Sequence, residues 1–532
     1  MGTDFSNSFK TRVITCFATI ALVFVFAPLL FPSIPAPYWF HDHFFNTLKI
    51  AENFRTKGFP TFDGVTPTND FSLLWGLTLS GLSALVSSET AVFFILVRLL
   101  LGLALCLSLW LFNRLIDALD LQPEKETRFL TSAFLAAFFL YTALSGSDAA
   151  LAIPCFFAMA LSLLKALEHP SFASGIILGL TVSLSAFTRF DCGAFFLTAV
   201  LVFYFQFNSK YPLSKKQALI LLAGIIAGLI PLMVYADTLQ TKFGSPVPAE
   251  LLSWGKTQDI APWRLLIVLF FEPLRYVFQM PQAVALVFFP SLLLPLVAYV
   301  SFPWLGKEQK PRDTVFYTLI WYPILYLTAL AGITFITLPE YAFYPLAAGA
   351  PIALLFATRK INSQLPEEEK KLARRAWLIL GGLLLLICLT LSIKPRSAFL
   401  SAFAQTFAEF AGQHPGRYAM SSGAGMISFM TKADIVRLDG MAEDQNLLNM
   451  LEKQEDLGNA FKHYKIDYYV AFKPQKDKEC YSAREPVQNR FGGTNKGLSD
   501  WLCAAPVFEK QITPKTTMAI FKIDEAGKAA FP

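Results

Sequence analysis

The chain has 532 residues, of which 54% are hydrophobic and 16% are charged, and its mean hydropathy is +0.47. A soluble protein of this length carries far more charge, so the composition predicts a polytopic membrane protein. The formal net charge of +6 is modest, and no stripe of basic and aromatic residues accompanies it, which argues against a nucleic-acid partner.

The first predicted element is a transmembrane helix. An apolar run from Val13 to Phe31 follows Lys10 and Arg12. The run is too long for a signal peptide, and prolines follow it where a small-residue cleavage site would be needed. We therefore expect an uncleaved helix with its N-terminus in the cytoplasm.

A polar loop, residues 33–70, follows this helix and holds Asp42 between two histidines. Apolar residues recur at helical spacing over 44–57, and Gly58 comes next, which predicts an interfacial helix that ends there. Charged groups at a membrane usually mark function. Asp42 has two expected roles: it could take a proton from an acceptor hydroxyl, or it could cap the helix that follows.

His41 and His43 flank Asp42 and could bind a metal ion or a phosphate. Adjacent residues on a helix point to different faces, so a metal site built from all three side chains is not expected. We assign no metal ligands. The sequence neither requires nor excludes a divalent cation.

The other apolar runs predict a helical bundle. They lie near 71–86, 90–112, 129–145, 150–167, 173–188, 193–207, 217–236, 282–304, 315–337, 343–358 and 377–393. Each span needs about 20 apolar residues, and several of these runs are shorter. Segment 263–280 contains charges and is expected at the outer interface.

Loop charge predicts which connections share a side. Three basic loops, near 208–216, 307–312 and 359–375, are expected inside. The loop 33–70 and everything after residue 393 then lie outside. Arg114 and the segment from Lys125 to Arg128 are also expected inside, so an odd number of spans must separate them from the outer loop. Only one of the runs 71–86 and 90–112 can therefore be a full span, and the other is re-entrant or interfacial. The expected number of crossings is about eleven, within a range of about eleven to thirteen.

The composition after residue 393 becomes mixed polar and apolar, which predicts a small α/β domain, 394–532, on the outer face. Segments 466–472 and 518–521 resemble strands, and 446–463 is helical in pattern. Cys480 and Cys503 could form a disulfide there, worth roughly 3 kcal/mol.

Charged residues also occur at the predicted outer tips of the bundle. Asp148 lies at one tip, and Arg189 and Asp191 lie at another. A guanidinium suits a phosphate well. Surface ion pairs and turn chemistry are the plainer interpretation of these tips. Glu340 and Tyr341 lie at a third tip, where tyrosine is common for reasons unrelated to function.

The chain resembles the GT-C superfamily of integral-membrane glycosyltransferases, which use polyprenyl-phosphate sugars. It is most similar to a bacterial branch of arabinofuranosyltransferase-like and mannosyltransferase-like proteins. The matching residues are Lys49-Ile50-Ala51-Glu52-Asn53, Thr61-Phe62-Asp63-Gly64, Thr68-Asn69, Phe71, Leu74-Trp75, Gly146-Ser147-Asp148, Arg189-Phe190-Asp191, Gly423-Ala424-Gly425 and Asp439-Gly440. Asp42 aligns with the first acid of an Asp-Asp pair, whereas His43 replaces the second. A strict two-carboxylate mechanism is incompatible with that replacement.

The resemblance implies an inverting hexosyl- or pentosyltransferase with a polyprenyl-phosphate donor and a cell-envelope glycan, glycolipid or protein acceptor. The reaction would take place at the outer face of a bacterial inner membrane. Asp42 is the expected base. The expected donor-phosphate ligands are Arg189, His43 and Lys49, and the expected positioning residues are Asp148, Asp191, Asn69, Glu340 and Tyr341.

Two other hypotheses remain open. The first is a transporter or flippase of lipid-linked sugars. Transporters tend to carry inverted repeats with a site near the midplane, whereas here no repeat is evident and the polar residues gather at one face. The second is a GT-C relative that has lost activity, and His43 keeps this hypothesis open.

Overall fold

The computed structural model describes most of the chain. The described residues are 2–32, 34–69, 72–144, 146, 148–207, 214–246, 310–333, 339–392, 398–421, 423–438, 445–472, 474–477, 479–485, 497–513 and 516–529. The predicted segments 263–280 and 282–304 and the Asp439-Gly440 element lie outside this part of the chain. The predicted domain boundary near residue 393 also lies outside it and stays a prediction.

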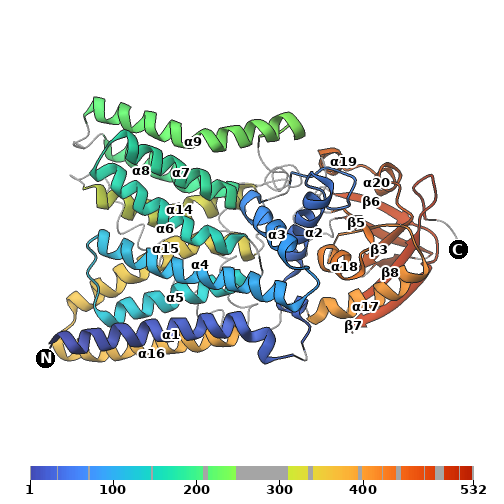
Figure 1. The fold of residues 1–532 in the computed structure, drawn as a ribbon. Coiled ribbons are helices and arrows are strands. Elements are labelled where there is room, and N and C mark those ends of the chain that lie inside the picture. Colours follow the sequence, from blue (N-terminus) through green and yellow to red (C-terminus); the bar gives the residue numbers. More distant parts are fainter. Residues whose placement is uncertain are drawn as a thin grey trace.

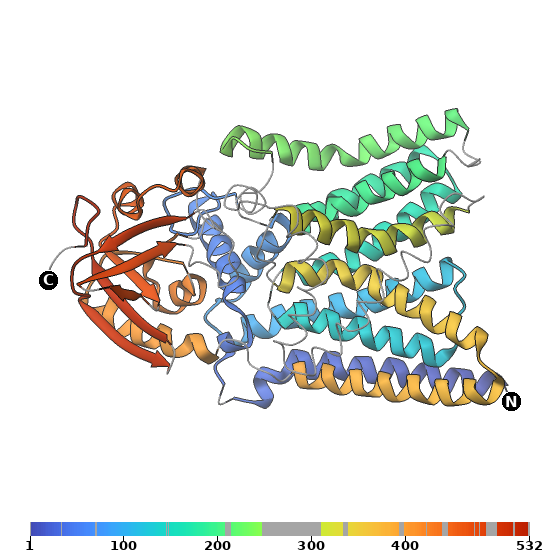
Figure 2. The same cartoon turned by 180° about the vertical axis from the view of Figure 1, so that it is seen from behind.

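Long helices lie side by side as a bundle in both views of the molecule (Figures 1 and 2). They are α1 (Gly2–Leu30), α4 (Ala91–Ala118), α5 (Lys125–Leu144), α6 (Ala149–Glu168), α7 (Phe172–Thr188), α8 (Gly193–Phe207), α9 (Lys215–Phe243), α14 (Pro311–Ile333), α15 (Pro339–Gln364) and α16 (Glu367–Ser392). Within the described residues, four stretches are long and apolar enough to cross a membrane: Ala91–Ala118, Ala149–Glu168, Lys215–Phe243 and Glu367–Thr390. The total number of crossings stays a prediction.

The structure identifies which of two neighbouring apolar runs is too short to span. Helix α3 (Leu73–Leu85) has 13 residues, a length of about 20 Å. The hydrocarbon core of a bilayer is about 30 Å thick. Helix α4 has 28 residues and is long enough. Helix α3 instead lies at one end of the bundle, beside α2 (Asp42–Lys57) (Figure 1).

The chain begins at the opposite end of the bundle (Figure 1), and ion pairs join the connections between helices there. Arg312 lies 3.3 Å from Asp120 and 3.6 Å from Glu168, and Arg374 donates to both oxygens of Glu124 at 3.0 and 3.1 Å. Connections predicted to share the inner side therefore do meet at one end. Which end faces the cytoplasm stays a prediction.

Helices α7 and α9 pack with their backbones in contact through glycines on both helices. A Cβ atom added at Gly228 would lie 2.4 Å from the carbonyl oxygen of Ile176, and one at Gly179 would lie 2.4 Å from that of Ile225. Ser183 donates a hydrogen bond to the Gly228 carbonyl at 3.0 Å. Small residues allow this approach between membrane helices. Within the described residues, α9 packs chiefly against α7, so this contact holds α9 to the bundle.

We therefore expect Gly228→Ala to destabilise the protein by about 1–3 kcal/mol, because a backbone carbonyl cannot turn aside for the added methyl group. The matched control is Gly382→Ala in α16, where an added Cβ meets nothing within 4 Å. That change is expected to raise stability by about 0.5–1 kcal/mol through helix propensity. Thermal unfolding in detergent measures both. A Gly228→Ala protein that melts at or above the wild-type temperature contradicts the described contact.

The C-terminal part of the chain is an α/β domain, as predicted. Its five-stranded sheet has the order β2-β1-β3-β8-β7, with β2, β1 and β3 parallel and β8 and β7 antiparallel to their neighbours. A separate antiparallel sheet has the order β4-β5-β6. The strands are β1 (Arg417–Met420), β2 (Asp434–Arg437), β3 (Tyr468–Phe472), β4 (Gln475–Asp477), β5 (Cys480–Glu485), β6 (Leu498–Leu502), β7 (Phe508–Thr513) and β8 (Thr516–Lys522). The helices are α17 (Ala398–Gln413), α18 (Ala424–Thr431), α19 (Gln445–Lys453) and α20 (Leu457–Tyr464).

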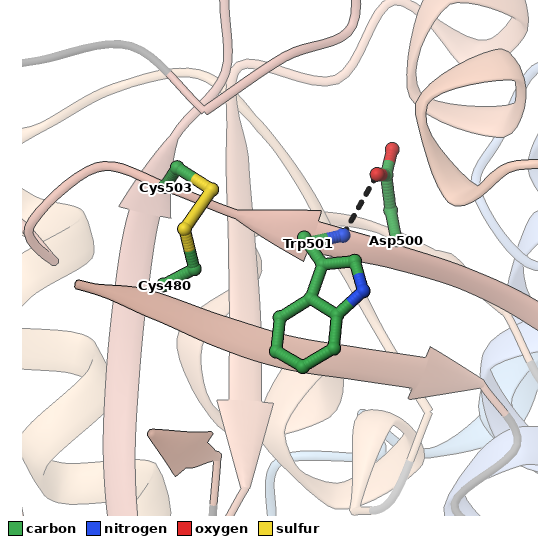
Figure 3. The surroundings of a disulfide bond; sticks show 4 residues. All are labelled: Cys480, Asp500, Trp501 and Cys503. Atoms are coloured by element: carbon green, nitrogen blue, oxygen red, sulfur yellow. Dashed lines mark hydrogen bonds between the residues drawn. A yellow bond between two sulfur atoms is a disulfide. The ribbon is translucent and has the colours of Figure 1, made fainter. Parts of the chain in front are cut away.

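A disulfide joins Cys480 and Cys503, a pairing that the sequence left open (Figure 3). Cys480 begins β5 and Cys503 directly follows β6. Tyr481 and Leu502 are register partners, so the two cysteines stand next to that pair at the end of the ladder. The bond closes a loop with a sequence separation of 23 residues and ties the two strands of the small sheet together.

Candidate active site

The predicted helix after the first span is present as α2, which begins at Asp42 and ends before Gly58. Gly58 has φ 83°, a left-handed conformation that glycine adopts without strain. The helix lies between the bundle and the C-terminal domain (Figure 1) and contacts α3 on one side and α18 on the other. Its aromatic residues Phe44 and Phe45 are fully buried. The helix is therefore enclosed between two parts of the protein.

Polar side chains of α2 hold the loop that follows it. The Asn53 side-chain amide donates to the carbonyl oxygens of Thr61 and Phe62, both at 2.9 Å. Ser88, which precedes α4, donates to the carboxylate of Glu52. The Glu52-Asn53 pair in the family-like motif thus has a structural use: it connects α2 to its own loop and to the bundle.

Asp63 organises the loop from within. Its carboxylate accepts hydrogen bonds from the amides of Val65 and Thr66 at 2.9 and 2.7 Å, and from the hydroxyls of Thr61 and Thr66 at 3.0 and 2.9 Å. Gly64 has φ 80°, which a side chain would strain. The Thr-Phe-Asp-Gly motif is therefore a tight turn built around one carboxylate.

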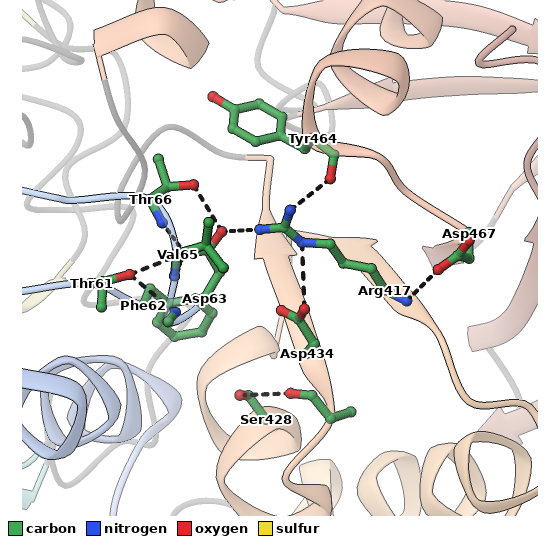
Figure 4. A network of polar contacts seen from close by, with 12 residues as sticks. Thr61, Phe62, Asp63, Val65, Thr66, Arg417, Ser428, Asp434, Tyr464 and Asp467 are labelled. Atoms are coloured by element: carbon green, nitrogen blue, oxygen red, sulfur yellow. Dashed lines mark hydrogen bonds and ion pairs between the residues drawn. The ribbon is translucent and has the colours of Figure 1, made fainter. Parts of the chain in front are cut away.

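The same carboxylate is bound by Arg417 of the C-terminal domain (Figure 4). Arg417 also donates from Nη1 to the Tyr464 carbonyl at 2.8 Å and from its backbone N–H to Asp467 at 2.7 Å, and it pairs with Asp434 at 3.5 Å. Burial raises the pKa of Asp434 above its ordinary value, against the opposing effect of Arg417. The segment with the strongest family likeness therefore docks the C-terminal domain.

Asp42, the expected base, is also held by that domain. Its Oδ1 accepts a hydrogen bond of 2.8 Å from the backbone N–H of Met426, in the first turn of α18. The approach of the two helices depends on Gly425, because a Cβ added there would lie 2.2 Å from Asn46 Oδ1 and 2.7 Å from the Asp42 carbonyl oxygen. Asp42 itself is half-buried.

The tip that carries Asp148 lies against the start of α2. A Cβ added at Gly146 would lie 2.6 Å from the Phe40 ring and 2.8 Å from the Phe44 side chain. The indole N–H of Trp75 donates to the Gly146 carbonyl at 3.0 Å. The structure thus brings this tip and the loop to one end of the bundle, as the predicted topology requires.

Asp148, Arg189 and Asp191 form one buried cluster. The Arg189 guanidinium donates to Asp148 Oδ1 at 3.1 Å and to both oxygens of Asp191 at 3.1 and 3.0 Å. The side chains of Arg189, Asp148 and Asp191 are 4%, 11% and 7% exposed. Tyr326 of α14 donates to Asp191 at 2.6 Å. The three charged residues were predicted from the sequence. Tyr326 was not, because it lies within an apolar run and no pattern there marks it as a site residue.

This pairing changes the expected role of Arg189. Its Nε, Nη1 and Nη2 atoms each donate to a carboxylate, and the three side chains together have a formal charge of −1. A second anion is repelled by such a cluster. The geometry favours a role for Asp148 and Asp191 in positioning Arg189, and it does not favour Arg189 as a phosphate ligand.

The two other expected phosphate ligands lie on α2. His43 is half-buried in its first turn. Lys49, two turns further on, is also half-buried. Burial lowers the pKa of Lys49, nearby Lys432 adds to this effect, and Glu52 and Asp434 oppose it. Lys49 therefore lies near charged groups of the C-terminal domain.

The remaining candidates are Asn69, Glu340 and Tyr341. Asn69 is buried in the loop before α3. Glu340 and Tyr341 lie in the first turn of α15, and their side chains lie outside the described part of the chain. Among the residues that are described, no group of three or more His, Cys, Asp or Glu side chains is placed to hold a metal ion.

Comparisons with known proteins show the fold. No protein-family model matches the sequence, and no curated protein matches it. The structure is similar to the crystal structure of ArnT from Cupriavidus metallidurans in the apo state, with a TM-score of 0.55 and 12% identity over 87% of this chain and 93% of that chain. It is also similar to ArnT bound to undecaprenyl phosphate, with a TM-score of 0.51 and 11% identity over the same shares.

A third alignment, with the cryo-EM structure of the mycobacterial arabinofuranosyltransferase AftD, has a TM-score of 0.45 and 13% identity. It covers 97% of this chain and 40% of that chain. The likeness to ArnT shows that this membrane protein has a GT-C fold with a small C-terminal sheet domain. Membership of the arabinofuranosyltransferase-like and mannosyltransferase-like branch stays a prediction.

Proposed function

We propose that this protein is a glycosyltransferase that takes a sugar from a polyprenyl-phosphate donor. The observation that carries the proposal is the half-buried carboxylate of Asp42, enclosed between a GT-C bundle and the C-terminal domain. ArnT, which shares the fold, has been crystallised bound to undecaprenyl phosphate, and this supports a polyprenyl-phosphate donor. The acceptor would be a cell-envelope glycan, glycolipid or protein.

In the proposed reaction, the acceptor hydroxyl oxygen attacks the anomeric carbon of the donor sugar. Asp42 takes the hydroxyl proton as the new C–O bond forms. The bond between the anomeric carbon and the phosphate oxygen breaks, and polyprenyl phosphate leaves with the bonding electrons. Attack opposite the leaving group inverts the anomeric configuration. Such a positioned base contributes about 10²–10⁴-fold in rate.

The roles of the other residues follow from their positions. His43 and Lys49 lie on the same helix as Asp42. We assign binding of the donor phosphate to these two residues. We assign a structural role to Arg189, together with Asp148 and Asp191, because Nε, Nη1 and Nη2 of Arg189 each donate to a carboxylate. Asn69, Glu340 and Tyr341 are assigned to substrate positioning. The proposed location is a bacterial inner membrane, with the N-terminus in the cytoplasm and the C-terminal domain in the periplasm.

A transfer assay tests the proposal. The purified protein is reconstituted into vesicles that contain polyprenyl-phosphate sugars labelled in either a hexose or a pentose, with bacterial envelope fractions as acceptor. The expected result is a labelled glycoside together with released polyprenyl phosphate. Labelled lipid that crosses the bilayer without glycoside formation would show a flippase, and an unchanged donor pool would indicate an inactive relative.

A further inference from the structure

Two elements that are far apart in the sequence meet at Asp42. Helix α2 follows the first span, and α18 belongs to the C-terminal domain, yet the two lie side by side (Figure 1). Met426 and Asp42 are separated by 384 positions. At Gly425 the helices approach so closely that any side chain would overlap Asn46. The first turn of α18 thus rests directly on the first turn of α2.

The contact uses a group that a helix leaves available. The first backbone N–H groups of an α-helix have no partner within the helix, and they form its positive end. Met426 is the third residue of α18, and its N–H donates to Asp42 Oδ1 at 2.8 Å. Hydrogen bonds from an N–H to a carboxylate are among the stronger ones in proteins. This bond holds the carboxylate in one orientation.

A second contact holds the same part of the domain in place. Strand β1 begins at Arg417 and leads, after Met420, into α18. Arg417 binds the buried carboxylate of Asp63 in the loop that follows α2 (Figure 4). The β1–α18 unit therefore touches the candidate active-site loop at two points, through a side chain at the start of β1 and through a backbone amide in the first turn of α18.

We propose that the β1–α18 unit of the C-terminal domain is a positioning part of the active site, with the Met426 amide orienting the Asp42 carboxylate for proton transfer. The proposal rests on the proposed function of Asp42 as the base. With Oδ1 held by the amide, Oδ2 is directed toward the acceptor hydroxyl. Met426 touches no substrate and acts only through Asp42.

A pair of substitutions at one position separates the amide from the side chain. Met426→Ala and Met426→Pro both shorten the buried Met426 side chain, but only proline removes the N–H. Proline is tolerated in the first turn of a helix. The preceding residue is Gly425, which lacks the Cβ that would collide with the proline ring. The two variants therefore differ at the Asp42 contact, where proline removes the N–H and also places its ring Cδ against the carboxylate, so that Asp42 loses the hydrogen bond and must turn away.

We expect kcat of Met426→Pro to be about 10- to 100-fold below that of Met426→Ala, because a misplaced catalytic group costs rate in this range. The KM for the donor should be the same in both variants, since the amide binds no donor. Equal kcat values for the two folded variants would overturn the inference. Thermal midpoints establish that both are folded.

A second variant covers the case in which Met426→Pro does not fold. Gly425→Ala places a methyl group 2.7 Å from the Asp42 carbonyl oxygen and 2.8 Å from the Asn46 backbone nitrogen, so α18 must move away from α2 and kcat should fall similarly. The matched control is Gly412→Ala in α17, where an added Cβ meets nothing within 4 Å, and it should keep wild-type kcat. Wild-type kcat in Gly425→Ala would overturn the inference.

Asp42→Asn in the same assay separates the two proposals. If Asp42→Asn is inactive while Met426→Pro and Met426→Ala turn over equally, the positioning inference fails and the proposed function stands. If Asp42→Asn transfers sugar at the wild-type rate, the assignment of the base fails, and the positioning inference fails with it.

Discussion

Asp42→Asn is expected to lower the rate of glycosyl transfer by about 10²–10⁴-fold while leaving the thermal midpoint unchanged. Asparagine keeps an Oδ1 atom that accepts the Met426 hydrogen bond, so the contact between α2 and α18 survives. It cannot take a proton from the acceptor. The substitution therefore separates the chemical role of the carboxylate from its role in the domain contact.

The measurement is initial rate against donor concentration in reconstituted vesicles, together with thermal unfolding in detergent. Asp477→Asn is a suitable control, because Asp477 is an exposed acid on β4 and should keep both rate and midpoint. A normal rate in Asp42→Asn would remove Asp42 as the base. A lowered midpoint with a normal rate per folded molecule would make Asp42 a purely structural residue.

Arg417→Met is expected to destabilise the protein by about 3–5 kcal/mol, because it leaves the carboxylate of Asp63 buried without its partner. The Asp63 side chain is 0% exposed and that of Arg417 is 17% exposed. Adding Asp63→Asn to Arg417→Met should recover part of the loss. The neutral amide oxygen can still accept from the amides of Val65 and Thr66.

Chemical denaturation followed by tryptophan fluorescence measures these differences. The matched control is Arg128→Met, which breaks a pair with Asp117 whose side chains are 33% and 58% exposed, and about 0–1 kcal/mol is expected there. If Arg417→Met costs no more than Arg128→Met, the contact between the loop and the C-terminal domain is weaker than its burial implies.

Much of the fold could be predicted because its signals are local. Apolar runs of helical length predicted the bundle, and basic loops predicted which connections share an end. The helix ending at Gly58 was also predicted, since a glycine stop is visible in a few residues, whereas the sequence left the Cys480–Cys503 disulfide open. The predicted sides of the loops required one short run among 71–86 and 90–112, and α3, with 13 residues, is that run.

The site was predicted less completely because charge partners are not visible in a linear pattern. The pattern Arg-Phe-Asp suggested a phosphate ligand, yet Asp148 and Asp191 engage the guanidinium of Arg189. Asp63 belonged to the most family-like segment, and its partner Arg417 lies 354 positions away. Neither pairing has a signal in sequence spacing, because each depends on how separate elements come together.

The sequence by itself determined that the chain is a membrane protein, which loops gather at each end, and that the polar loop with Asp42 is a candidate site. These properties follow from the side chains of short segments and their cost of transfer into a bilayer. Only the tertiary structure decided what holds Asp42, namely a backbone amide at Met426 and the absence of a side chain at Gly425. Every residue except proline has a backbone N–H, so its partner is set by packing and not by residue type.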